Sequence, residues 1–243
     1  MNHRNLIHRR LFVVGAAALT LSACAGEILG PPEAGPIYPV RPTFIPAAGG
    51  EKVNWALAVM RPDVPGGLDT DRIALLQPNG TLDYYANATY PERVPAAVQR
   101  ALVDGFESSG RIVAVAREQD ALHADYNLVT EVKDFEAKYS VQDGIPQAVV
   151  VIHAKLATAH GRKVLANFVT SKTANASANS TGAAVQALSQ AMNEAITEVV
   201  NWALAAAPPI MPGESAETTA SPAEQLLKDV TRGSEKVRGT AKP

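Results

Sequence analysis

A single cysteine, Cys24, limits what this chain of 243 residues can fold into, because no disulfide can form within it. It follows a leader with arginines at positions 4, 9 and 10 and an apolar run from Leu11 to Leu21. That run is far shorter than the roughly 20 residues that span a bilayer. The leader therefore predicts a secretory signal peptide over residues 1–23 rather than a transmembrane helix.

The segment Leu21-Ser22-Ala23-Cys24 resembles the lipobox of bacterial lipoproteins. In that class the cysteine receives a diacylglycerol, the leader is removed and the new amino terminus is acylated, commonly with palmitate. The resemblance implies that Cys24 is lipidated; an ordinary cleaved signal with a nearby cysteine is the alternative. Ala25 favours the periplasmic face of the outer membrane over inner-membrane retention, for which an aspartate is expected at this position. The leader leaves Sec and Tat export both open.

Composition divides the exported part into three segments. Prolines recur through residues 24–50, which predicts a semi-extended, lipidated tether of about 3 Å per residue. Residues 51–207 have the apolar content of a folded domain, and residues 208–243 predict a disordered polar tail. The net charge of −2 gives no basic footprint for nucleic acid.

Periodicity predicts two helices and a sheet. The first helix opens at Pro91 and ends at Gly110, and the second is capped by Ser180 or Thr181 and stopped by Pro208. The predicted strands are Val53–Met60, Arg72–Gln77, Leu82–Ala86, Ile112–Ala116, Tyr126–Val141, Gln147–Ala159 and Lys163–Ala174. A shift of the apolar set predicts a β-bulge near Asp134. We expect a single α/β domain with a mixed, largely antiparallel sheet packed by two main helices.

Residues for catalysis are scarce. Neither a P-loop nor a G-x-S-x-G motif is present, and the histidines outside the leader, His123, His153 and His160, have no metal-site spacing. We therefore predict no catalytic residue, no metal and no cofactor. An enzyme that uses His123, His153 and Asp125 remains the alternative.

Several segments resemble the ABC-type transport auxiliary lipoprotein family, to which the lipoprotein of the Pqi system belongs. The most specific are Tyr84-Tyr85-Ala86-Asn87-Ala88 and Phe106-Glu107-Ser108-Ser109-Gly110-Arg111, and the resemblance extends over residues 53–206. It implies a non-catalytic partner of an MCE-type transporter, in which an ATPase, a permease and an MCE-domain protein move phospholipids or other hydrophobic molecules between membranes. The lipoprotein is expected to dock the far end of the MCE bridge.

The resemblance also brings forward a set of candidate partner-binding residues: Tyr84, Tyr85, Asn87, Tyr90 and Arg111. The tyrosines and Asn87 follow one strand, where they either pack in the domain or form a contact surface. Arg111 is either in a structural ion pair with a nearby acid or a ligand of a lipid headgroup. Lipid itself and a second copy of the chain are further candidate partners. A structural or assembly lipoprotein of the envelope, unrelated to a transporter, is the alternative function.

Overall fold

The structure is a computed structural model that describes residues 35–44, 50–120, 123–160 and 163–210. The predicted signal peptide, Cys24, the first part of the tether and the tail beyond residue 210 lie outside the described residues.

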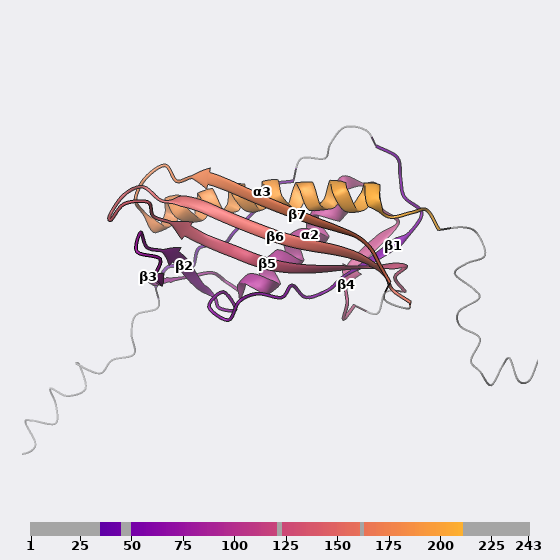
Figure 1. Cartoon of the computed structure of the whole chain (residues 1–243), viewed down its shortest axis with the longest axis horizontal. Helices are drawn as coiled ribbons and strands as arrows, with labels where there is room; N and C mark the ends of the chain where they lie inside the picture. Colours follow the sequence, from indigo (N-terminus) through magenta and orange to yellow (C-terminus); the bar gives the residue numbers. More distant parts are fainter. Residues whose placement is uncertain (1–34, 45–49, 121–122, 161–162, 211–243) are drawn as a thin grey trace, which may run out of the picture. The chain divides into compact units, whose positions relative to one another are not determined.

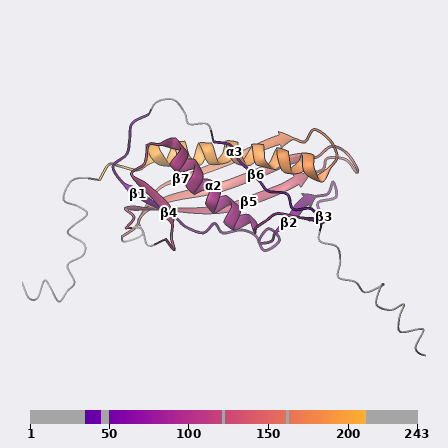
Figure 2. The same cartoon turned by 180° about the vertical axis from the view of Figure 1, so that it is seen from behind.

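Seven strands of the described part form one mixed sheet, and two helices pack on one of its faces (Figures 1 and 2). This confirms the predicted fold class and shows that the domain has two layers. The strands are β1 Ala56–Val59, β2 Arg72–Leu76, β3 Leu82–Thr89, β4 Ala114–Arg117, β5 Tyr126–Lys138, β6 Gln147–Thr158 and β7 Val164–Asn175; the helices are α2 Val94–Ser109 and α3 Thr181–Ala206.

Strand β5 is the centre of the sheet. One of its edges pairs antiparallel with β6 over its full length, and the other pairs parallel with both β1 and β2. β7 then pairs antiparallel with β6, β3 antiparallel with β2, and β4 parallel with β1. The register of β5 shifts between Val132 and Asp134, which confirms the predicted bulge. The short strands predicted near residues 53 and 72 thus pair side by side with the same edge of one long strand. They do not pair with each other.

Helix α3 follows its sequence pattern closely. The Ser180 hydroxyl accepts a hydrogen bond from the amide of Ala183 at 3.3 Å, so serine is the N-cap. Every residue of the predicted apolar stripe is buried against the sheet: Val185, Leu188, Met192, Ile196, Val199 and Ala203. The helix ends at Ala206, two residues before Pro208.

Helix α2 begins later than predicted, at Val94 instead of Pro91, and Pro95 occupies its first turn. The preceding residues are held out of the helix by a neighbouring loop. The amide of Tyr90 donates to the carbonyl of Asp71 at 2.7 Å, and that of Val94 donates to Thr70 at 3.2 Å. Gly110 ends the helix with a φ of 61°, a conformation that favours glycine.

Residues 36–44, which the sequence assigns to the tether, pack on the domain. We call them the N-terminal arm. The amide of Tyr38 donates to the carbonyl of Thr89 at 2.8 Å, and Val40 is only 4% exposed within the main core. Further along, Phe44 packs near Gly105 of α2, where a β-carbon would stand 3.4 Å from its ring. The folded unit therefore begins before residue 51.

Shortening the side chain of Val40 tests whether the arm belongs to the folded unit. We expect Val40→Ala to lower the free energy of unfolding by about 1–3 kcal/mol, because it removes buried apolar volume. Urea denaturation monitored by circular dichroism measures the change, with the exposed Thr43→Ala as the matched control. Equal stabilities of the two variants would contradict a packed arm.

Candidate functional site

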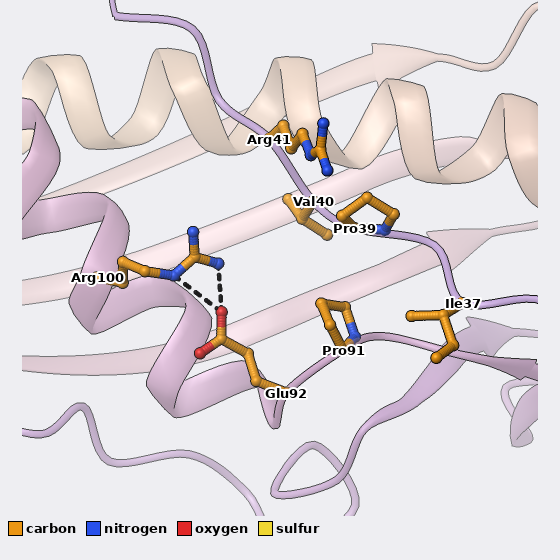
Figure 3. A pocket seen from close by; sticks show the side chains of 7 residues that line it. All are labelled: Ile37, Pro39, Val40, Arg41, Pro91, Glu92 and Arg100. Atoms are coloured by element: carbon orange, nitrogen blue, oxygen red, sulfur yellow. Dashed lines mark hydrogen bonds and ion pairs between the residues drawn. The ribbon is translucent and has the colours of Figure 1, made fainter.

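A groove of about 610 Å³ opens between the N-terminal arm and the start of α2 (Figure 3). The arm and α2 are distant in sequence and meet because the arm crosses the helical face of the domain. Its lining residues are Ile37, Pro39, Val40 and Arg41 of the arm, and Pro91, Glu92 and Arg100 from the α2 region.

The charged side chains of the groove are unequally paired. The guanidinium Nε of Arg100 donates to Oε1 of Glu92 at 2.9 Å, as Figure 3 shows. Arg41 has no carboxylate partner among the described residues, and its backbone amide donates to the Ser189 hydroxyl at 3.4 Å. The groove thus carries one uncompensated positive charge beside apolar surface. An anionic group with an apolar portion matches that combination.

No sequence motif or spacing predicts this groove. Arg41 lies in a proline-rich stretch whose composition indicates a tether, and Glu92 and Arg100 read as ordinary polar positions at the start of a helix. The juxtaposition depends on the arm folding back across the domain. Only the apolar residues Val40 and Phe44 could have hinted at it, because apolar residues in a free tether serve no packing purpose.

Tyr84 and Tyr85 point in different directions from β3 and serve packing. The Tyr84 hydroxyl donates to the carbonyl of Gly67 at 2.9 Å, and its ring lies under the guanidinium of Arg72, 3.8 Å from the centroid. Tyr85 is hydrogen-bonded to the Tyr139 hydroxyl at 2.9 Å. Burial and this hydrogen bond raise the pKa of Tyr85. Both side chains are half-buried, so each retains an accessible edge.

Asn87 and Tyr90 differ completely in exposure. Asn87 is exposed with a φ of 52°, at a bulge where several residues of β3 face one residue of β2. Asparagine tolerates that left-handed conformation better than most residues. Tyr90 is 3% exposed in the core, edge-on to Phe135, and burial raises its pKa. Of these two candidates, Asn87 is therefore exposed to solvent and Tyr90 is enclosed in the core.

Arg111 lies apart from the tyrosines, after the C-terminal end of α2. Its Nε donates to the carbonyl of Glu51 at 3.1 Å, and the amide of Val53 donates to the Arg111 carbonyl at 2.8 Å. A β-carbon on Gly50 would stand 2.6 Å from the guanidinium. Arg111 is thus structural, but it holds a main-chain segment instead of pairing with an acid. The five candidate residues do not form one surface.

In the enzymatic alternative, which uses His123, Asp125 and His153, His153 is distant from Asp125. Asp125 accepts a hydrogen bond from the amide of Ala56 at 2.8 Å, which joins β1 to the start of β5. His153 pairs with Glu131 of β5. Glu131 lies six residues after Asp125, so His153 is roughly 20 Å from Asp125 along the strand. His123 is exposed in the connection before β5. These three side chains do not converge on a common point.

Among the described residues, no group of three or more histidine, cysteine, aspartate or glutamate side chains is placed to hold a metal ion. Within the same residues, no helix combines the length and the apolar content that crossing a bilayer requires.

The family assignment comes from a match over most of the folded domain. The family model of the ABC-type transport auxiliary lipoprotein component matches residues 41–200, well over half of the chain. The chain belongs to this family. Members are lipoproteins that serve ABC-type transporters, so the family assignment gives this chain an auxiliary role in transport and an envelope location.

Solved structures share the fold of this family member. Protein XCC0632 from Xanthomonas campestris, of the family DUF330, is 29% identical, with a TM-score of 0.66 over 70% of this chain and 95% of that one. An uncharacterized protein of known structure has a TM-score of 0.55 at 16% identity and supports the fold alone.

A relative found by sequence is protein bll6063 of Bradyrhizobium diazoefficiens. It is 27% identical over 124 residues, which make up 51% of this chain but only 32% of the length of bll6063.

Glu136 offers a test of electrostatics on the sheet. It is 7% exposed, and burial together with the neighbouring Asp134 carboxylate raises its pKa. Because the folded-state pKa lies above the unfolded one, the glutamate destabilises the fold increasingly as pH rises through these values. We expect Glu136→Gln to be more stable than wild type at about pH 8 and the gap to close near about pH 4. Urea denaturation at both pH values measures it, with exposed Glu107→Gln as the control; a pH-independent gap would contradict the assignment.

Proposed function

We propose that this protein is an outer-membrane-anchored, periplasmic auxiliary lipoprotein of an MCE-type transport system that moves phospholipids or other hydrophobic molecules between membranes. The observation that carries this proposal is the family match over residues 41–200, preceded in the sequence by a lipobox-like segment that ends at Cys24. In this proposal the domain has a docking role and performs no catalysis.

The anchor is the acylated Cys24. Each CH₂ group of an acyl chain that enters the bilayer contributes about 0.8 kcal/mol, so three chains retain the protein permanently on one membrane. Eleven residues, 25–35, then separate the cysteine from the N-terminal arm. The domain therefore stays close to the membrane that holds the acyl chains.

The docking surface for the MCE-domain protein includes β3. This strand pairs with β2 on one edge only, so most of its second edge is available to a partner. Asn87 is exposed along it, and the edges of Tyr84 and Tyr85 are partly accessible. The permease and the ATPase are partners through the MCE-domain protein, and the ATPase supplies the energy. A homo-oligomer of this chain would repeat the same surface around a collar.

The alternative is a structural or assembly lipoprotein of the cell envelope. It shares the anchor and the tether, and it needs no transporter beside it. Genes for an ATPase, a permease and an MCE-domain protein next to the gene of this protein favour the transport role. Their consistent absence favours the alternative.

Replacing the lipid-bearing sulfur tests the anchor. We expect Cys24→Ser to lose the acyl groups and to leave the outer-membrane fraction, because an oxygen at this position does not accept the diacylglycerol. Metabolic labelling with a palmitate analogue, followed by membrane fractionation, measures both effects. Wild-type labelling and fractionation in the variant would rule the anchor out.

A second measurement tests docking. We expect the full-length lipoprotein to co-purify with the MCE-domain protein from its own cells, and Asn87→Arg to reduce recovery about tenfold or more because a bulky cation disrupts a packed interface. Val113→Arg, at another exposed position on a different part of the domain, is the control. No recovery of an MCE-domain protein from a strain that expresses one would contradict the proposal.

A further inference from the structure

The most exposed large apolar side chains of the described residues are unevenly distributed. Five are more than half exposed: Val113 at 69%, Val141 at 64%, Ile37 at 63%, Ile145 at 61% and Val169, within β7, at 59%. Val141 and Ile145 lie in the turn between β5 and β6, and Ile37 lies in the N-terminal arm. Val113 precedes β4, at the opposite end of the sheet (Figure 1). Ile37, Val141 and Ile145, three of the five, therefore need a joint explanation.

Contacts connect the β5–β6 turn to the arm. The side-chain amide of Asn179 donates to the carbonyl of Asp143 in the turn at 3.0 Å, and α3 begins two residues later at Thr181. A β-carbon on Gly182, in the first turn of α3, would stand 3.7 Å from the ring of Tyr38. The turn, the start of α3 and the start of the arm thus occupy one end of the domain, which we call the arm end.

Hydrogen bonds fix the conformation of the β5–β6 turn, so its apolar side chains project from a defined backbone. Tyr139 donates to the side-chain oxygen of Asn179 at 2.8 Å, and the amide of Gly144 donates to Val141 at 3.2 Å. The amide of Ala176 donates to the carbonyl of Pro146 at 3.0 Å. A braced turn with projecting aliphatic side chains is suited to enter an apolar phase without reorganising.

The length of the tether determines which end of the domain lies near the membrane. Twelve residues, 25–36, separate Cys24 from Ile37. Such a segment spans at most roughly 40 Å when extended. The far end of the sheet lies roughly 40 Å beyond the arm end, which is the length of β5. The arm end is therefore kept at a high effective concentration near the bilayer.

From these observations we propose that the arm end rests on the phospholipid bilayer, with Ile37, Val141 and Ile145 entering its interface. The proposal rests on the proposed acylation of Cys24. Arg41 lines the same groove as Ile37 (Figure 3), four residues further along the arm, and has no carboxylate partner among the described residues, so it is available to pair with a lipid phosphate. Isolated projecting side chains suit a fluid surface, whereas a protein partner would need matching cavities. The contact fixes the orientation of the domain and directs its β1–β4 end away from the membrane.

Site-directed spin labelling of the full-length acylated protein tests this orientation. Cys24 carries the acyl groups, so Ile145→Cys, Ile37→Cys and the control Val113→Cys can each be labelled singly. The variants are reconstituted into vesicles of phosphatidylethanolamine and phosphatidylglycerol. We expect the labels at 145 and 37 to be at least several-fold less accessible to a water-soluble nickel chelate than the label at 113, and more accessible to oxygen. Thermal unfolding by circular dichroism confirms that each labelled variant is folded.

Three results would overturn the proposal, and each has a distinct cause. Labels at 145 and 37 as accessible to the chelate as the label at 113, in an acylated sample, exclude the bilayer contact alone. Protection from both chelate and oxygen that appears only after the MCE-domain protein is added assigns the arm end to a protein interface. An intact mass without acyl groups refutes the anchor itself, and with it the premise of the proposal.

Discussion

The pairing of β5 along both of its edges is the interaction on which the rest of the structure depends. Its 13 residues bring together β6 on one side and two short strands, β1 and β2, on the other. Neither short strand has enough length to form a stable sheet by itself, so each derives its position from β5. The helices then cover the one face on which the apolar residues of these strands gather. Disruption of β5 would separate the two halves of the sheet.

The parts that were predicted from sequence depend on local periodicity. The stripe of α3, the serine cap and the bulge in β5 each follow from the spacing of apolar residues over one or two turns or strand pairs. The parallel pairing of β1 and β2 with β5 was not predicted, because partner choice between strands depends on contacts between distant segments. The later start of α2 has the same origin: main-chain hydrogen bonds from residues 90 and 94 to residues 70 and 71 outweigh the preference of Pro91 for a first helical turn.

The candidate site shows the same division between local pattern and long-range packing. Motif similarity selected Tyr84, Tyr85, Asn87, Tyr90 and Arg111 as a group, but strand alternation sends neighbouring side chains to opposite faces. The tyrosines therefore brace a loop, a turn and the core, and only Asn87 is freely exposed. The groove, by contrast, arises where a proline-rich segment folds back on a helix. Short motifs cannot reveal such a site, because its residues acquire proximity only in the folded chain.

The packed arm changes what a tethered domain of this kind can do. A long free tether gives reach but leaves the orientation of the domain undefined, whereas an arm that crosses the helical face transmits the position of the chain's entry to the whole sheet. Val40 in the core and the hydrogen bonds between the arm and Thr89 make that entry point rigid. In the proposed anchoring, acyl groups on Cys24, twelve residues before Ile37, act on a defined end of the domain. The docking proposed at the exposed edge of β3 would then occur at a defined height above the membrane, as the proposed bridge between two membranes requires.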